Sequence, residues 1–375
     1  MIRFFPYGDI LRGPEIRTSP RDAEIRRIIE SRLEAKIAMD ESVDYEDWME
    51  PASMLAAAIE QGLEICIRGD KYGAPDIHLP GQACPEIAIG RFPRGGPGGG
   101  LQWPMNTGLA NHYGSLISFA DLAGRRTILC DMPGDREQSG TSSTGEFARA
   151  GASNDLFDTI SSFTGKRIAV KQTRPSKAHP VTFVDVPVGA DRDWAKRWFF
   201  DEWGFHFARF EGEPDCMLVQ EAIDMEYETR FFVIGGRVVS GSACVSEFTP
   251  AMRDPANVVS DCTFATFERK PFSGDFVTNQ SMAMEMQIFA QDAARKIMDE
   301  VPALTSFVID VAKGPDGFCI IELNPADQAG LYANDCHAIL RAIVEVSVDI
   351  EPQPDDISWP PVVAVPDQEF LEFEP

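Results

Sequence analysis

The feature of the sequence that most constrains the fold is a predicted β-hairpin over residues 305–323. Two largely apolar stretches flank the turn Gly314-Pro315-Asp316-Gly317. Proline presets the backbone angle at the first turn position, and glycine supplies the left-handed residue of a three-residue loop with a bulge. Such a loop places Gly314 opposite Phe318 and, further along the strands, Asp310 opposite Glu322. The turn therefore predicts which side chains face each other.

The two faces of this hairpin differ in character. Residues opposite each other in an antiparallel pair have Cβ atoms about 4.5–5.5 Å apart, so the two carboxylates are expected to lie close together. Asn324 lies two positions beyond Glu322 and points to the same face. The other face carries apolar side chains, namely Phe307, Ile309, Val311, Cys319, Ile321 and Leu323. One face therefore belongs to the core, and the other presents a polar group.

Facing carboxylates repel each other unless a cation lies between them. Carboxylate and amide oxygens suit Mg²⁺ or Mn²⁺, with water and phosphate completing the coordination. Asp310, Glu322 and Asn324 are therefore candidate metal ligands. The alternative is a solvated strand face followed by an ordinary turn at Asn324-Pro325.

A second polar segment follows a buried-type strand at residues 217–220. The backbone edge after such a strand can hydrogen-bond a purine, a carboxylate a few residues on can hold ribose hydroxyls, and an arginine can neutralise phosphate charge. Upstream, Lys171 ends an otherwise apolar strand and can reach a phosphate as a point charge. Taken alone, Lys171 is more typical of a strand-end lysine whose stem packs against apolar surface.

The pattern from residue 154 onward predicts an α+β protein in which antiparallel hairpins pack under helices. Gly235-Gly236 is a favoured two-residue hairpin turn between two of these strands. A helix is predicted from Ser53 to Gly62. We expect an N-terminal domain over residues 1–150, a second domain over 151–349, and an extended acidic, proline-rich tail over 350–375.

Composition excludes several classes of function. The chain has 375 residues and a formal net charge of −25, which disfavours nucleic acid and anionic membranes as partners. No apolar stretch is long enough for a membrane span. The eight cysteines form no Cys-x-x-Cys pair, which favours reduced thiols in a cytoplasmic protein over a zinc ribbon or a redox motif.

The order of these parts resembles the ATP-grasp superfamily. The matching features are the strand lysine Lys171, the segment Val219-Gln220-Glu221-Ala222-Ile223, the Glu228-Thr229-Arg230 triplet with the hairpin after it, and the set Asp310, Glu322 and Asn324. The resemblance covers roughly residues 154–345. It implies an ATP-grasp fold, in which two α+β subdomains with antiparallel sheets enclose ATP, preceded by a separate α/β N-terminal domain.

The resemblance also implies roles for individual residues. Asp310, Glu322 and Asn324 would hold one or two Mg²⁺ (or Mn²⁺) ions, and Lys171 would contact ATP phosphate. The hinge Gln220-Glu221-Ala222-Ile223 would contact adenine through its backbone. Glu226 or Glu228 would bind the ribose, and Arg230 the phosphate or an acyl-phosphate. The family has a further phosphate-binding lysine upstream, for which Arg125, Arg126 or Arg136 are candidate replacements.

The activity that the resemblance implies is an ATP-dependent carboxylate–amine ligase. ATP would phosphorylate a small-molecule or peptide carboxylate, and an amine substrate would then displace the phosphate, with Lys171 and Arg230 as catalytic residues. Charge neutralisation by metal, lysine and arginine is what such a phosphoryl transfer needs. Two alternatives stay open, an ATP-grasp phosphotransferase and a nucleotide-binding module without turnover.

Overall fold

The structure is a computed structural model of the whole chain. It describes residues 2–4, 10–14, 20–67, 77–82, 87–89, 116–130, 154–172, 181–207, 217–244, 250, 258–260, 263–264, 266–269, 276–278, 280–326 and 329–348. The expected tail over 350–375 lies outside these residues, as do Arg136 and the loop that follows Gln172.

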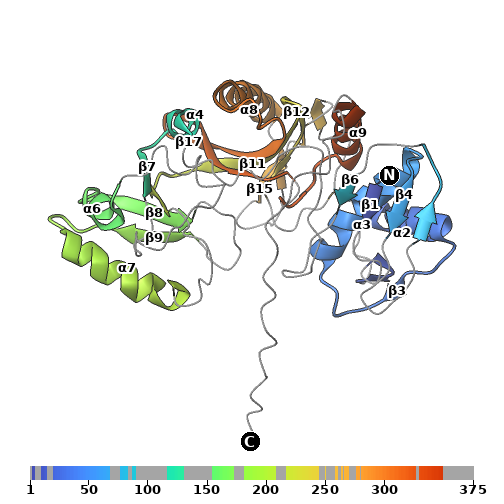
Figure 1. Cartoon of the computed structure of the whole chain (residues 1–375), viewed down its shortest axis with the longest axis horizontal. Coiled ribbons are helices and arrows are strands. Elements are labelled where there is room, and N and C mark those ends of the chain that lie inside the picture. Colours follow the sequence, from blue (N-terminus) through green and yellow to red (C-terminus); the bar gives the residue numbers. More distant parts are fainter. Residues whose placement is uncertain are drawn as a thin grey trace, which may run out of the picture.

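The N-terminal part contains a small sheet with strand order β5-β4-β1-β6. In it β1 runs parallel to both β4 and β6, and β5 is antiparallel to β4. The elements of this part are β1 (Ile2–Phe4), β2 (Arg12–Gly13), α2 (Pro20–Leu33), β3 (Ala38–Met39), α3 (Tyr45–Glu60), β4 (Ile65–Ile67), β5 (Ile77–Leu79) and β6 (Ile87–Ile89). Figure 1 shows α2 and α3 beside this sheet.

Helix α3 begins at Tyr45 and not at Ser53, so the predicted start was wrong. Pro51 lies inside the helix, where a proline normally interrupts the backbone hydrogen bonds. Trp48 and Met49, on the N-terminal side of this proline, are buried in the core. Tertiary packing therefore keeps the first turns helical despite the proline.

The second sheet is antiparallel throughout, with strand order β7-β10-β8-β9. Helices α6 and α7 pack on it and supply much of its core, which contains Phe199 and Trp203. The elements are β7 (Thr127–Cys130), α6 (Leu156–Ser161), β8 (Arg167–Gln172), β9 (Thr182–Asp185), α7 (Arg192–Phe207) and β10 (Met217–Glu221). Strand β7 precedes residue 150, and it pairs with β10 all the same.

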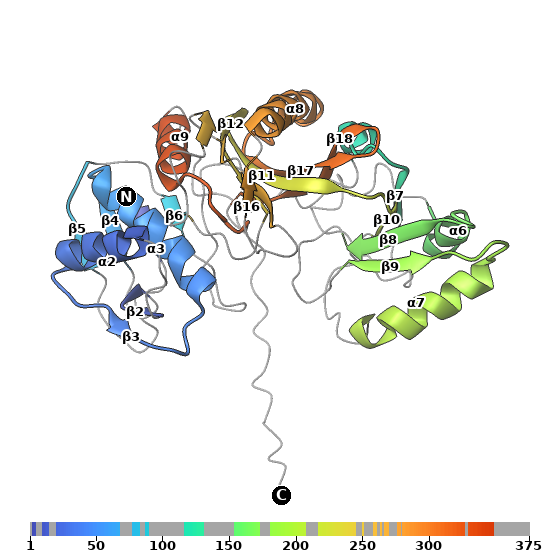
Figure 2. The same ribbon diagram turned by 180° about the vertical axis from the view of Figure 1, so that it is seen from behind.

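The third sheet has the order β13-β14-β12-β11-β17-β18, and its pairs are antiparallel except for β12 with β14. Figure 2 shows α8 lying across it and α9 beside it. The elements here are α4 (Ile117–Leu122), β11 (Glu226–Ile234), β12 (Arg237–Ala243), β13 (Val258–Ser260), β14 (Thr263–Phe264), the separate pair β15 (Thr266–Arg269) and β16 (Phe276–Thr278), α8 (Gln280–Glu300), β17 (Phe307–Gly314), β18 (Gly317–Asn324) and α9 (Cys336–Val348). These two largely antiparallel sheets with their helices confirm the predicted α+β class.

The two predicted hairpins of this sheet are present. Gly235 and Gly236 have φ angles of +56° and +74°, as a two-residue turn of the favoured kind requires. In the last hairpin Gly314 pairs with Gly317, so the predicted three-residue loop was wrong. A shift of register between Asp310 and Val311 then restores Asp310 opposite Glu322, because a bulge adds one residue to one strand.

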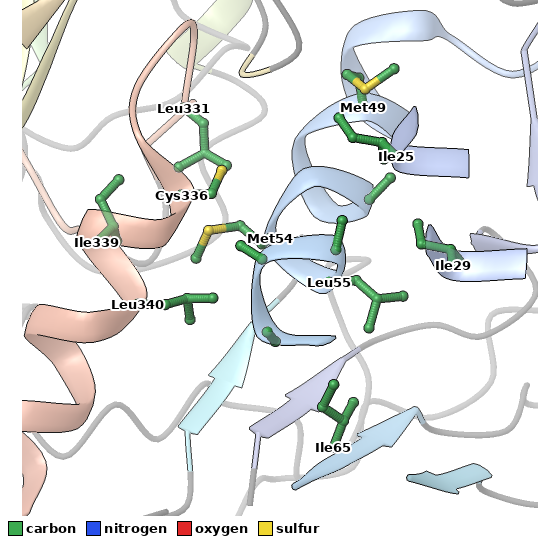
Figure 3. Packing of buried hydrophobic residues seen from close by; sticks show 14 of the residues in the cluster. Ile25, Ile29, Met49, Met54, Leu55, Ile65, Leu331, Cys336, Ile339 and Leu340 are labelled. Atoms are coloured by element: carbon green, nitrogen blue, oxygen red, sulfur yellow. The ribbon is translucent and has the colours of Figure 1, made fainter. Parts of the chain in front are cut away.

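Alternating side chains of β11 belong to two different cores. Phe231 and Val233 pack with α8, whereas Phe232 and Ile234 pack with α9 and the N-terminal helices. Figure 3 shows this second core, where Met54 of α3 points toward Leu340 of α9. Since Arg230 alternates with Phe231, it lies on the α9 side of the sheet.

Among the described helices, none combines the length and the apolar character that a membrane crossing requires.

Candidate functional site

A row of charged side chains crosses three neighbouring strands of the third sheet. Arg230 of β11 pairs with Asp310 of β17, which pairs with Glu322 of β18. Residues directly opposite in a sheet share a face, so the three side chains lie side by side. The predicted juxtaposition of Asp310 and Glu322 is therefore present, and an arginine extends it.

Arg230 and Asp310 form a buried two-point ion pair. The Arg230 Nε donates to Asp310 Oδ1 at 2.8 Å, and Nη2 donates to Oδ2 at 2.7 Å. Arg230 is 9% exposed and Asp310 is 1% exposed. A guanidinium that meets a carboxylate along two parallel hydrogen bonds is held in one orientation. The cation that balances Asp310 in this structure is thus the side chain of Arg230.

Lys171 connects the second sheet to this row. Its Nζ lies 3.2 Å from Glu322 Oε2 and 3.2 Å from the carbonyl oxygen of Ile321. Burial alone would raise the pKa of Glu322, but Lys171, the amide of Asn324 and Arg230 outweigh it and lower the pKa to about 2. Glu322 is therefore ionised, and the strand-end lysine points into the site.

Asn324 joins the two facing carboxylates. Its Nδ2 donates to Glu322 Oε1 at 3.0 Å and to Asp310 Oδ2 at 3.3 Å. The three candidate metal ligands are therefore brought together. Facing carboxylates repel each other, and this amide, Arg230 and Lys171 now compensate that repulsion.

Two further groups complete the cluster. Ligand atoms of Glu228, Cys244 and Asp310 all lie within 4.8 Å of one another. Glu228 is still reached by solvent, but the surrounding protein removes part of its hydration, and with the charges of Asp310 and Glu322 this raises the pKa of Glu228 to about 7. Burial, together with the nearby carboxylates, raises the pKa of the Cys244 thiol well above its usual range. Oxygen atoms, not a thiolate, are thus the ligands on offer.

The predicted hinge follows β10 directly. The backbone N–H of Glu221 donates to the Arg126 carbonyl at 2.9 Å, and that of Ala222 donates to the Arg167 carbonyl at 2.9 Å. The expectation of a free backbone edge over this whole segment was therefore wrong, because neighbouring strands take up these two groups. Ile223 lies next: a Cβ at Gly314 would be 3.1 Å from Ile223 Cδ1, so the hinge abuts the turn of the last hairpin.

The side chains around the hinge form a small polar network. Gln220 accepts a hydrogen bond from Arg125 Nη2 at 3.2 Å and donates to Thr127 Oγ1 at 3.2 Å. Glu221 pairs with Lys166 at 2.8 Å on the exposed side. Of the candidate upstream cations, Arg125 thus adjoins the hinge.

The other candidates lie elsewhere. Arg126 contacts Ser162 and lies over the ring of Phe163. Glu226 opens β11 opposite Lys313.

The sequence analysis missed a loop that contacts Arg230 from outside the three strands. Arg230 Nη1 donates to the Gly330 carbonyl at 3.3 Å, and the guanidinium carbon lies 4.9 Å from the centre of the Tyr332 ring. The only local signal was an aromatic residue in a glycine-containing segment after Asn324, which is too common to single out.

Together, the fold and these side chains define an α+β protein in which two largely antiparallel sheets meet at a cluster of three carboxylates and two cations. Residues 193–344 match a family model of the ATP-grasp domain, the one for family 3 of its clade. The chain thus belongs to the ATP-grasp superfamily, and the resemblance seen in the sequence is confirmed.

Solved structures give more distant similarities. The ATP-grasp ligase PsnB complexed with a minimal precursor is 16% identical over 64% of this chain and 61% of its own, with a TM-score of 0.31. For the D-alanine–D-alanine ligase from Coxiella burnetii the values are 12%, 65%, 57% and 0.34. For the D-alanine–D-alanine ligase from Bacillus anthracis complexed with ATP they are 11%, 92%, 96% and 0.38.

The chain thus spans about three fifths of the length of the first two of these structures. At these values the similarity assigns no role to any residue of this chain. No curated protein sequence matches it.

Proposed function

We propose that this protein is an ATP- and Mg²⁺-dependent ligase that joins a carboxylate to an amine. The observation that carries the proposal is the cluster at the meeting point of the two sheets of an ATP-grasp domain. There Lys171 of one sheet reaches Glu322 of the other, and Arg230 is locked onto Asp310. Polyphosphate chemistry needs cations held in fixed places beside carboxylates that can bind a metal.

The donor set fits a hard divalent cation. Asp310, Glu322 and Asn324 would hold it, with Glu228 close by, and all four offer oxygen atoms of the kind that Mg²⁺ prefers. Asn324 now directs its N–H group at the carboxylates, so the amide would turn to present its oxygen. When bound, the metal would neutralise charge on the phosphates during transfer.

The nucleotide would lie between the two sheets. Lys171 and Arg230 are placed for its phosphates, and the hinge of Gln220, Glu221, Ala222 and Ile223 for adenine. Because the N–H groups of Glu221 and Ala222 are already bonded, we assign the purine edge mainly to the backbone at Ile223. Glu226 or Glu228 would bind the ribose.

The proposed reaction has two displacements. A substrate carboxylate oxygen attacks the γ-phosphorus of ATP, and the bond to the leaving ADP oxygen breaks. The amine nitrogen then attacks the acyl carbon, phosphate leaves with the bonding electrons, and the amine loses a proton. Lys171 and Arg230 stabilise the negative charge in both steps, so no covalent protein intermediate is needed.

The test is isothermal titration with a non-hydrolysable ATP analogue, with and without Mg²⁺. Glu322→Gln should lose the Mg²⁺-dependent part of binding. Asp316→Asn is the matched control, because it removes a carboxylate from the exposed turn of the same hairpin. Absence of binding by the unaltered protein would overturn the proposal, as would full Mg²⁺-dependent binding by Glu322→Gln.

A second assay separates the ligase from its alternatives. Panels of carboxylates and amines are screened for release of ADP and free phosphate. A ligase releases both, and only when both substrates are present. ADP without free phosphate would indicate a phosphotransferase, and binding without any release would indicate a module that does not turn over.

A further inference from the structure

The loop between β18 and α9 is fastened by buried side chains from two other elements. Glu50 of α3 accepts hydrogen bonds through Oε1 from the backbone N–H of Leu331 at 2.6 Å and of Tyr332 at 3.4 Å. On β12, Ser242 Oγ accepts from the N–H of Ala333 at 3.0 Å. Consecutive N–H groups of the loop thus each have a side-chain acceptor.

This fastening maintains a conformation that the loop would otherwise avoid. Tyr332 has a φ of +47°, in the left-handed region that a bulky side chain seldom adopts. Such a residue persists only where its surroundings over-determine it, and such residues concentrate at functional sites. The bonds from Glu50 and Ser242 bracket Tyr332 on both sides, so they are the direct reason why its backbone stays in this region.

The loop in turn positions Arg230. Asp310 fixes one edge of the guanidinium through two hydrogen bonds. The remaining contacts come from the loop, where the Gly330 carbonyl accepts from Nη1 and the Tyr332 ring lies against the guanidinium face. Both groups lie within two residues of the N–H groups that Glu50 binds.

We infer that Glu50 is a positioning residue for Arg230, acting through the backbone of residues 330–332. An N-terminal helix would thereby control the orientation of a side chain that the proposed function assigns to phosphate, and in this respect the inference rests on that function. Glu50 is 5% exposed, and a buried carboxylate that accepts backbone N–H groups makes stronger hydrogen bonds than a neutral acceptor. A purely structural role would tie α3 to the loop without any effect on Arg230.

The experiment compares three variants of the full chain with the unaltered protein. Glu50→Ala removes the acceptor. Glu50→Gln keeps an oxygen in the same place and should restore most of the effect. Tyr45→Phe is the control, because it removes a buried hydrogen bond to the Asp22 carboxylate in the same part of the chain and leaves the loop untouched.

The first readout is hydrogen exchange of the Arg230 Nε–H, followed by NMR and assigned with Arg230→Lys. In the unaltered protein this proton should exchange slowly, because Asp310 accepts it in a buried place. Glu50→Ala should speed exchange at least tenfold, whereas Glu50→Gln and Tyr45→Phe should stay within about threefold of the unaltered protein. Equal protection in Glu50→Ala would overturn the inference, and so would equal loss in Tyr45→Phe.

The second readout is affinity for the ATP analogue with Mg²⁺. Glu50→Ala should weaken it at least tenfold at a temperature where the variant is folded. If the unaltered protein binds no nucleotide, the proposed function fails, and exchange at Arg230 still decides the role of Glu50. Should Glu50→Ala not fold, Ser242→Ala takes its place, because it removes the acceptor of the next N–H along the loop and should shift both readouts in the same direction.

Discussion

At the scale of single residues, the two facing carboxylates are not equivalent. Asp310 is almost wholly buried, and both of its oxygens accept hydrogen bonds from Arg230. The Glu322 side chain is 31% exposed, and its cationic partner is the lysine of another sheet. Substitutions that look alike in the sequence therefore have different physical consequences.

We predict that Asp310→Asn lowers the free energy of unfolding by about 3–5 kcal/mol, because it leaves the Arg230 guanidinium buried without its counter-charge. Glu322→Gln should cost about 1–2 kcal/mol, since the carboxamide still accepts one hydrogen bond and water reaches the group. Urea denaturation of both variants measures the difference. Equal losses would show that Arg230 finds another partner when Asp310 is neutral.

The sequence located the carboxylates and the amide but not what neutralises them. The turn chemistry near residue 315 is local, and alternation along two strands then places Asp310, Glu322 and Asn324 on one face. The partner Arg230 is 80 residues from Asp310 in the chain, and only the pairing of β11 with β17 brings the two together. A metal was expected as the balancing cation, whereas the protein already supplies Arg230 and Lys171.

At the scale of elements, the same limit applies to register. The Gly235-Gly236 turn was predicted because two left-handed residues in sequence allow few alternatives. The last hairpin was predicted with the correct facing pair but the wrong loop, since a two-residue turn and a bulge give the same register at Asp310 as a three-residue loop. Helix α3 shows the opposite case, because the burial of distant side chains overrides a local proline.

The start of α6 offers an element-scale prediction. Asp155 Oδ1 accepts from the N–H groups of Phe157 and Asp158, both at 2.9 Å, and its Oδ2 accepts from Arg192 Nη2 of α7 at 2.8 Å. Asp155→Ala should cost about 1–2 kcal/mol, because the cap and the ion pair are both lost. Asp155→Asn should cost less than about 1 kcal/mol, since asparagine caps equally well and an exposed ion pair contributes little. Thermal unfolding of both variants measures this.

The pH dependence of the Asp155→Ala effect follows from the same contacts. The hydrogen bond from Arg192, with the helix N–H groups, lowers the pKa of Asp155. A lowered pKa in the folded state means that the stabilisation is complete above the unfolded pKa of about 3.9. It is lost as the pH falls through the folded value, so the stability difference between the two proteins should shrink below about pH 4. A difference that grew on acidification would contradict the assignment.

At the scale of the whole molecule, the described cores are three, and they do not follow chain order. One joins the N-terminal helices to α9 and to Phe232 and Val308 of the third sheet. Another lies between that sheet and α8, and the third lies between the second sheet and the helices α6 and α7. The N-terminal helices are thus packed into the domain that carries Arg230 and Asp310, whereas the sheet that carries Lys171 has a core of its own.

This division predicts how two core substitutions spread through the molecule. Met54→Ala, between α3 and α9, and Phe199→Ala, in α7, should each cost about 2–5 kcal/mol. Because local opening follows cooperative units, Met54→Ala should speed amide hydrogen exchange in α3, α9 and β11 and leave α6 and α7 unchanged. Phe199→Ala should do the reverse. Hydrogen-exchange mass spectrometry resolves these segments, and acceleration of all of them by either variant would mean that Lys171 and Arg230 belong to one cooperative unit.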